Sequence, residues 1–205
     1  MNIVIIGNGG HSKVIKEMVL NNNDFELLAQ LDDMYDDIFS ENKILYGPIS
    51  YYKHLINIYK ELKFVIAIGN NETRKKVFLN LCLPSDFYAT VIHPSATVSK
   101  SATLGAGTVV MAQAVLNAES IIGEQVIINT GAIVEHDNQI KNFSHTSPRS
   151  TLTGNVYVGE GVHIGAGATI LPNVKIGDWS IVGAGATVTK DIPACKTAVG
   201  IPARF

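Results

Sequence analysis

The chain has 205 residues, of which 46% are hydrophobic, 17% charged and 7% aromatic, and its formal net charge is −2. This length suffices for one or two domains with a core, and the charge excludes a general electrostatic attraction to nucleic acid or anionic membranes. No apolar stretch is long enough to span a membrane, the N-terminus lacks the features of a signal peptide, and two cysteines make no disulfide framework. We therefore expect a soluble cytoplasmic protein.

Residues 1–91 alternate between strand-like and helix-like patterns. Apolar runs at Ile3–Ile6, Phe25–Leu31 and Phe64–Ile68 predict three strands, and apolar residues at helical spacing follow the first and third runs. This alternation is typical of a small parallel sheet with right-handed crossovers. The sequence therefore predicts a Rossmann-like α/β domain over 1–91, with its binding crevice at the carboxyl ends of the strands.

The first turn of this domain resembles a dinucleotide-binding motif. Gly7–Ser12 reads Gly-x-Gly-x-x-Ser, and Asp32 and Asp33 follow about 20 residues on. A three-stranded unit is only half of a dinucleotide fold, so a UDP-sugar is the better ligand, with backbone N–H groups at the helix start facing phosphate. The alternative is structural, namely glycines for a tight turn and acids in a solvated loop.

The composition changes after Val91, because 20 charged residues lie in 1–91 but only 14 in 92–205. An aliphatic residue recurs at every sixth position from Ile92 to Val188, with Thr146 as the one exception. A period of six fits neither a helix nor a flat strand, but it fits a β-helix with coils of 18 residues, stacked about 4.8 Å apart. We expect this coil over 92–190, with small residues and glycines permitting its corners and a tail at 191–205.

These patterns together resemble the sugar acetyltransferases of the PglD and NeuD type, which join a small nucleotide-binding domain to a left-handed β-helix. The resemblance covers essentially the whole chain. The segments that carry it are Gly7–His11, Leu31–Asp33, Ala67–Asn71, Asn129–Thr130, Glu135–Asp137, Phe143–His145 and Gly200–Ala203. The resemblance implies a left-handed coil and a homotrimer.

The same resemblance implies an activity and a set of site residues. PglD-type enzymes acetylate the amino group of a UDP-linked 4-amino-4,6-dideoxy sugar, in bacterial surface polysaccharide or glycoprotein glycan synthesis. His136 matches the general base, and Asp137 matches the acid that raises its basicity. The residues implied to contact acetyl-CoA are His145, Gly165, Ala166, Gly183 and Ala184. Those implied to hold the UDP-sugar are Gly9, Gly10, His11, Asp32, Asp33 and Gly69.

The chemistry itself is consistent with these residues. Acetyl transfer to an amine requires removal of a proton as the C–N bond forms, and an imidazole accepts protons near neutral pH. A neighbouring carboxylate favours the imidazolium that results. His136 lies two residues after the inward Val134, so its side chain is expected to point outward at a corner, into a cleft between neighbouring subunits.

Further residues bear on the mechanism. His145 and His163 are one coil apart and should stack on one face. A metal pair is conceivable there, but contact between His145 and acetyl-CoA is preferred and no metal is expected. Cys82 is expected in the core and Cys195 in the tail, so direct transfer is favoured over a covalent acyl-enzyme. Pro148 should remove a ladder donor and reshape its corner.

Two other functions remain open from the sequence. One is O-acetylation of a sialic acid or related sugar, in which an alcohol replaces the amine. The other is a non-catalytic β-helix that senses nucleotide sugars or serves as a scaffold.

Overall fold

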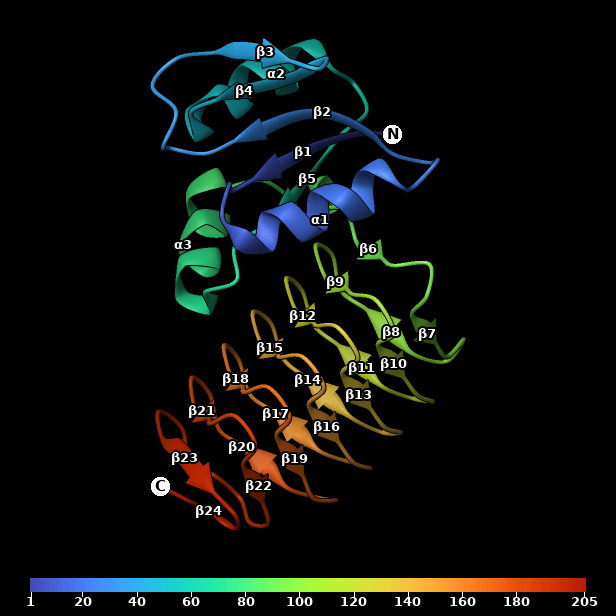
Figure 1. Ribbon diagram of the computed structural model, residues 1–205, viewed down its shortest axis with the longest axis vertical. Coiled ribbons are helices and arrows are strands. Elements are labelled where there is room, and N and C mark those ends of the chain that lie inside the picture. The colour runs from blue at the N-terminus through green and yellow to red at the C-terminus, as the bar shows by residue number, and fades with distance from the viewer. The chain divides into compact units, whose positions relative to one another are not determined.

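The structure is a computed structural model that describes residues 1–205. The chain divides into two compact units, Met1–Val91 and Ile92–Phe205 (Figure 1). None of its helices has the length and hydrophobicity required to cross a bilayer.

The N-terminal unit contains a five-stranded sheet in the order β3-β4-β2-β1-β5. Its strands are β1 (Asn2–Ile6), β2 (Glu26–Leu31), β3 (Phe39–Glu41), β4 (Ile44–Gly47) and β5 (Leu62–Ile66). Strands β1, β2, β4 and β5 are parallel, and β3 pairs antiparallel with β4. The central β1 is fully buried from Ile3 to Ile6, which explains its uninterrupted β-branched sequence.

The expectation of three strands was wrong, because β3 and β4 add two more. Every residue of β3 is exposed, so this strand has no apolar alternation by which it could be recognised. The hairpin turns through Asn42 and Lys43, whose φ angles of 50° and 67° are left-handed. A turn of this kind is usually signalled by glycine, and glycine is absent here.

Three α-helices and two 3₁₀ helices accompany the sheet: α1 (Gly10–Leu20), η1 (Ile49–Tyr51), α2 (Tyr52–Ile58), α3 (Asn71–Leu81) and η2 (Ser85–Phe87). The side chain of Asn70 caps α3 by accepting a hydrogen bond from the Thr73 N–H at 2.8 Å. Cys82 ends α3 with a left-handed φ of 50° and is exposed. The expectation of a core cysteine was therefore wrong, because a helix end replaces the buried position that its apolar neighbours suggested.

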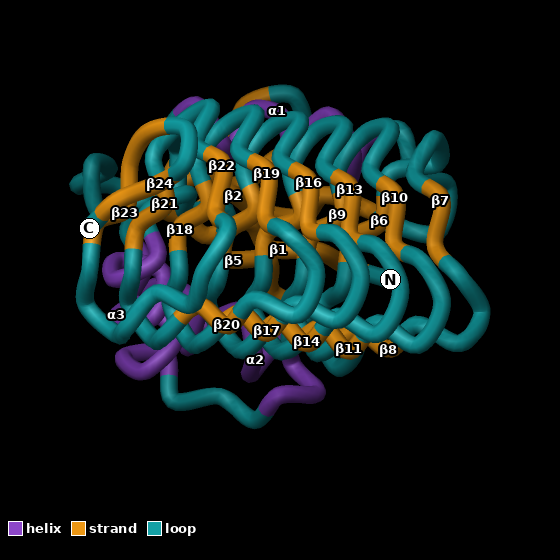
Figure 2. Tube along the Cα trace, turned by 90° about the horizontal axis from the view of Figure 1, so that it is seen from below, coloured by secondary structure: helices purple, strands orange, loops and turns teal.

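The C-terminal unit is a coil with three sheets, seen as rows of short strands in Figure 2, in which every strand except β24 pairs in parallel. The first sheet contains β6 (Val91–Ile92), β9 (Val109–Val110), β12 (Ile127–Ile128), β15 (His145–Thr146), β18 (His163–Ile164), β21 (Ile181–Val182), β23 (Thr197–Gly200) and β24 (Ala203–Arg204). The second contains β7 (Thr97–Val98), β10 (Val115–Leu116), β13 (Ile133–Val134), β16 (Thr151–Leu152), β19 (Thr169–Ile170) and β22 (Thr187–Val188). The third contains β8 (Thr103–Leu104), β11 (Ile121–Ile122), β14 (Gln139–Ile140), β17 (Tyr157–Val158) and β20 (Lys175–Ile176).

The predicted period of six forms the core of this coil from Val110 onward, whereas Ile92, the first residue of the series, is 38% exposed. From Val110 to Val188, the residue at each sixth position is at most 2% exposed. Paired strands are offset by 18 residues, as in Val115 with Ile133. Thr146 occupies one inward position at 0% exposure, and its hydroxyl donates to the Ile127 carbonyl at 3.2 Å. This bond compensates for the burial of a polar group among aliphatic side chains.

Glycines in the coil serve two purposes that the sequence analysis did not separate. Every sixth residue from 107 to 185 has a positive φ, and nine of these 14 residues are not glycine. The glycines that directly follow an inward residue are needed instead for space. At Gly165, an added Cβ would lie 2.5 Å from the backbone nitrogen of Ala184 on the next coil.

The corner at Pro148 and the segment 191–205 were expected to depart from the regular coil, but both stay within it. Pro148 keeps the corner regular, since its carbonyl accepts from the Gly167 N–H at 2.9 Å and the Arg149 N–H donates to Thr130 at 3.0 Å. Residues at this position of the hexapeptide, such as His136, donate no backbone hydrogen bond to the next coil. A proline at this position therefore removes no hydrogen bond from the ladder. The segment expected as a tail continues the coil, with β23 parallel to β21 and β24 antiparallel to β23.

Candidate functional site

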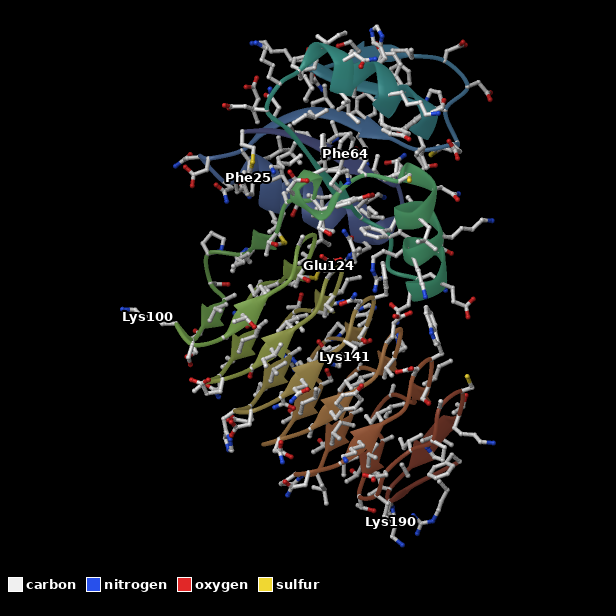
Figure 3. The ribbon with its side chains drawn as sticks, turned by 180° about the vertical axis from the view of Figure 1, so that it is seen from behind. Phe25, Phe64, Lys100, Glu124, Lys141 and Lys190 are labelled. Carbon is white, nitrogen blue, oxygen red and sulfur yellow. The ribbon has the colours of Figure 1, made fainter.

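The side chains of His136 and Asp137 form a hydrogen-bonded pair at the corner that follows β13. The Nδ1 atom of His136 lies 2.6 Å from Oδ2 of Asp137, and the two side chains are 61% and 57% exposed. Lys100 and Lys190, which Figure 3 labels, differ from His136 by multiples of 18 residues and so occupy the same register on other coils. A carboxylate can only accept, so Nδ1 donates, and the neutral ring keeps the lone pair of Nε2 for an incoming proton.

The backbone beneath this pair is fixed by Asn138, which is completely buried. Its amide nitrogen donates to the carbonyls of Glu135 at 2.6 Å and Thr153 at 2.9 Å, and its oxygen accepts from the Val156 N–H at 3.2 Å. Most other residues in this register are small or aliphatic. The amide was therefore a signal that sequence reasoning missed.

Glu135 precedes the pair and contacts the preceding coil. Its Oε2 accepts a hydrogen bond from the amide of Asn117 at 2.8 Å, and Asn117 lies 18 residues earlier in the chain. The corner therefore presents two carboxylates and one imidazole from three consecutive residues.

His145 and His163 stack on one face of the coil, as the spacing predicted. They are register partners on β15 and β18, and their rings are 5.0 Å apart in an edge-to-face arrangement. Nε2 of His145 lies 3.0 Å from the Asn129 amide nitrogen, and Nε2 of His163 lies 3.3 Å from the Ser147 hydroxyl. The protein contains no group of three or more His, Cys, Asp or Glu side chains suited to a metal ion.

The four small residues implied in cofactor contact come together on two consecutive coils. The Gly165 N–H donates to Val182, and the Gly185 N–H donates to Ala166, both at 2.8 Å. Ala166 and Ala184 are exposed. Gly165 is buried, so the two alanine methyl groups are the exposed side chains of this corner.

In the N-terminal unit, Gly9 and Gly10 form the start of α1. Gly9 is the N-cap without a side-chain capping bond, both glycines are exposed, and a Cβ on either would meet nothing within 4 Å. The buried Ser12 hydroxyl donates to the Gly9 carbonyl at 2.7 Å and so holds the turn. An uncapped helix N-terminus of this kind favours an anion.

The two acids after β2 organise loops, and Asp32 does so at the turn that precedes α1. Each oxygen of Asp32 accepts one backbone N–H, from Asn8 at 2.7 Å and from Met34 at 2.9 Å. Asp33 accepts the Ile49 N–H at 3.0 Å with one oxygen. The side chain of Asn8 also donates to the Tyr35 hydroxyl at 2.7 Å. These bonds give both acids a structural role, and their contact with a nucleotide sugar stays a prediction.

His11 and Gly69 lie side by side, since a Cβ on Gly69 would be 3.8 Å from that of His11. Burial, together with the nearby positive charge of Arg74, lowers the pKa of His11 to about 4. Arg74 is itself buried, which lowers its pKa to about 9, and it donates to the carbonyls of Ile68 at 2.9 Å and Gly69 at 3.2 Å. Sequence reasoning missed Arg74, because nothing distinguished it from an exposed helix residue.

Comparison with known proteins identifies the family. Residues 2–81 match the PglD N-terminal domain, and residues 155–190 match the bacterial transferase hexapeptide with six repeats. PerB from Caulobacter crescentus, solved in complex with CoA and GDP-perosamine, is 37% identical with a TM-score of 0.90, over 100% of this chain and 96% of that one. The chain belongs to the PglD-type family of sugar acetyltransferases. Its coil is accordingly a left-handed parallel β-helix.

Two further acetyltransferases are similar to this chain, one over nearly its whole length and the other over about half of it. The acetyltransferase domain of PglB from Neisseria gonorrhoeae, solved with acetyl coenzyme A, is 35% identical with a TM-score of 0.86, over 99% of this chain and 98% of that one. UDP-N-acetylbacillosamine N-acetyltransferase of Bacillus subtilis is 48% identical over 108 residues. That match spans 53% of this chain and only 50% of the relative.

Proposed function

We propose that this protein transfers the acetyl group of acetyl-CoA to the amino group of a nucleotide-linked amino sugar, with His136 as the general base. The observation that supports this assignment best is the pair of His136 and Asp137, an exposed imidazole oriented by a carboxylate at 2.6 Å. This is the arrangement required of a base that must accept a proton and then carry positive charge.

The proposed reaction is a direct transfer. The sugar amine attacks the thioester carbonyl, the new C–N bond forms, and Nε2 of His136 takes a proton from the nitrogen. The C–S bond then breaks, the thiolate of CoA leaves, and the proton held by His136 is returned to it or to water. Asp137 stabilises the imidazolium in the interval. Both cysteines are free and exposed, and neither is assigned an acyl-carrying role.

The proposed acceptor is a UDP-linked 4-amino-4,6-dideoxy sugar, as in the glycans of bacterial surfaces. The Bacillus subtilis relative acts on a UDP-linked amino sugar by its name, whereas PerB was solved with a GDP-linked one. In the N-terminal unit, the start of α1 at Gly9, Gly10 and His11 would face the phosphates. Asp32, Asp33 and Gly69 would contact the nucleoside.

The proposed acetyl-CoA site lies along the coil. His145 would contact the cofactor beside Asn129, and the corner that contains Gly165, Ala166, Gly183 and Ala184 would line the pantetheine arm. Two solved relatives contain CoA or acetyl-CoA, which supports the choice of donor.

We also propose a cytoplasmic homotrimer, with His136 at a cleft between subunits. One outer face of the coil supports this, because the outward residues of the second sheet are uncharged and β-branched. They are Thr97, Val115, Ile133, Thr151, Thr169 and Thr187. A flat face of this kind is suited to a symmetric interface between copies.

The test is release of CoA from acetyl-CoA across UDP- and GDP-linked amino sugars and sialic acids. We expect turnover with a UDP-amino sugar, and we expect His136→Ala to reduce kcat by about 10²- to 10⁴-fold. His93→Ala is the matched control, since it removes a histidine from the first coil. Turnover with sialic acid alone would indicate O-acetylation. No turnover, together with no thermal stabilisation by acetyl-CoA, would indicate a non-catalytic protein.

A further inference from the structure

The imidazole of His136 packs directly over Gly154, one coil further on. A Cβ built on Gly154 would lie 2.7 Å from Cε1 and 2.8 Å from Nε2 of the His136 ring. Real Cβ atoms do not approach other heavy atoms this closely, so the ring occupies the space that any other residue at 154 would need. The His136 ring can therefore lie in this position because Gly154, on the next coil, has no Cβ.

Glycine is not needed at this position for its backbone. Gly154 does not have a positive φ, so an L-residue could adopt its conformation. The same register of the hexapeptide elsewhere holds Ala112, Ala118, Asn142 and Pro172, and Gly154 is its only glycine. The only glycine in this register is therefore the residue on which the His136 ring lies.

The backbones of the two corners cannot separate to make room. The Asn155 N–H donates to the His136 carbonyl at 3.0 Å. Asn138 bonds to the carbonyls of Glu135 and Thr153, each adjacent to one of the two residues in question. A Cβ at 154 would therefore displace the imidazole, which can rotate, and not the chain. Rotation would move Nε2 and lengthen the contact between Nδ1 and Asp137.

We propose that Gly154 is a positioning residue that sets where the Nε2 atom of His136 meets the acceptor, by leaving room for the ring. This inference depends on the proposed function, because it assigns Gly154 a role through His136. A displacement of about 1 Å in a reacting group costs on the order of 10²-fold in rate. The stability of the coil should hardly change, since only one exposed side chain moves.

The test compares Gly154→Ala, His136→Ala and the double variant. We expect Gly154→Ala to reduce kcat by about 10²-fold, with an unchanged thermal midpoint and an unchanged KM for acetyl-CoA. Because the effect acts through His136, the double variant should have the same kcat as His136→Ala. A double variant slower than His136→Ala by the full Gly154→Ala factor would overturn the proposal. Pro172→Ala, at the same corner one coil further on, is the control.

A second readout does not depend on turnover. In protein labelled at histidine, the Cε1–H resonance of His136 is identified by its absence from His136→Ala. Gly154→Ala should shift this resonance and leave those of His54 and His93 in place. An unshifted His136 resonance would contradict the proposed contact.

The two proposals fail in different ways. If His136→Ala retains full activity, the proposed base is wrong and Gly154 has nothing to position. If His136→Ala is inactive and Gly154→Ala is as active as the unchanged protein, the base is retained and the positioning role is rejected.

Discussion

Adjacent residues rarely pair through their side chains in an extended strand, and the pair of His136 and Asp137 depends on the corner that contains it. Asp137 has a left-handed φ of 61°, which turns the chain between the two side chains. Aspartate tolerates this conformation better than most residues. The residue that supplies the carboxylate is thus also suited to the turn.

Asp137→Asn separates these two contributions. Asparagine keeps the length and the tolerance of a left-handed backbone but removes the charge that stabilises the imidazolium. We expect kcat to decrease by about 10-fold or more, with little change in KM, measured by steady-state kinetics. Glu119→Gln, one coil earlier in the same register and also left-handed at φ 60°, is the control. Equal kcat values in Asp137→Asn and the unchanged protein would exclude the carboxylate's role.

The lowered pKa of His11 predicts how stability depends on pH. The folded protein holds His11 neutral down to about pH 4, whereas an unfolded histidine binds its proton near pH 6.5. The unfolded state therefore binds more protons in this window, and the free energy of unfolding should decrease as the pH falls from about 6.5 to 4.

The variant His11→Gln tests this linkage. It should show a smaller decrease in the free energy of unfolding over the same window, measured by urea unfolding at several pH values. Identical pH profiles for the variant and the unchanged protein would show that His11 is not the group responsible.

At the scale of elements, the coil tolerates non-glycine residues where the backbone is left-handed but not where two coils approach. A Cβ on Gly123 would lie 2.8 Å from the backbone nitrogen of Asn142. Gly185, with φ of +66°, has nothing within 4 Å of the same position. The two glycines therefore differ both in backbone conformation and in what the next coil brings near.

Gly123→Ala and Gly185→Asn should therefore differ in stability. Overpacking against backbone should lower the free energy of unfolding of Gly123→Ala by about 1–3 kcal/mol. Asparagine accepts a left-handed backbone, so Gly185→Asn should change it by less than about 1 kcal/mol. Chemical denaturation measures both. Equal losses would contradict the distinction between the two kinds of glycine.

At the scale of the whole molecule, the proposed trimer determines whether the site is complete. We expect light scattering to give three times the 22.1 kDa mass of the chain. Ile133→Lys would place a charge on the β-branched face and should favour the monomer, because a buried charge without a partner is costly. A stable monomer that retains full activity would reject the intersubunit cleft.

The periodic parts of the protein could be predicted from the amino-acid sequence. Inward aliphatic positions, the stacking of His145 on His163 and the buried strand Ile3–Ile6 each follow from a regular spacing, and a spacing survives in a linear sequence. The segment that contains His136 and Asp137 could also be recognised from the sequence, because a charged segment is conspicuous in a charge-poor coil. The family resemblance supplied the roles that spacing could not.

The amino-acid sequence alone could not show how much space a contact between coils leaves, or how exposed segments pair. The hairpin of β3 and β4, the buried Arg74, the Asn138 network and the space at Gly154 depend on contacts between residues distant in sequence or on exposed turns. The period of 18 indicates which residues are neighbours on successive coils, but not whether the space between them requires a glycine. A glycine required by a ring 18 residues away therefore looks the same, in the sequence, as a glycine required by its own backbone.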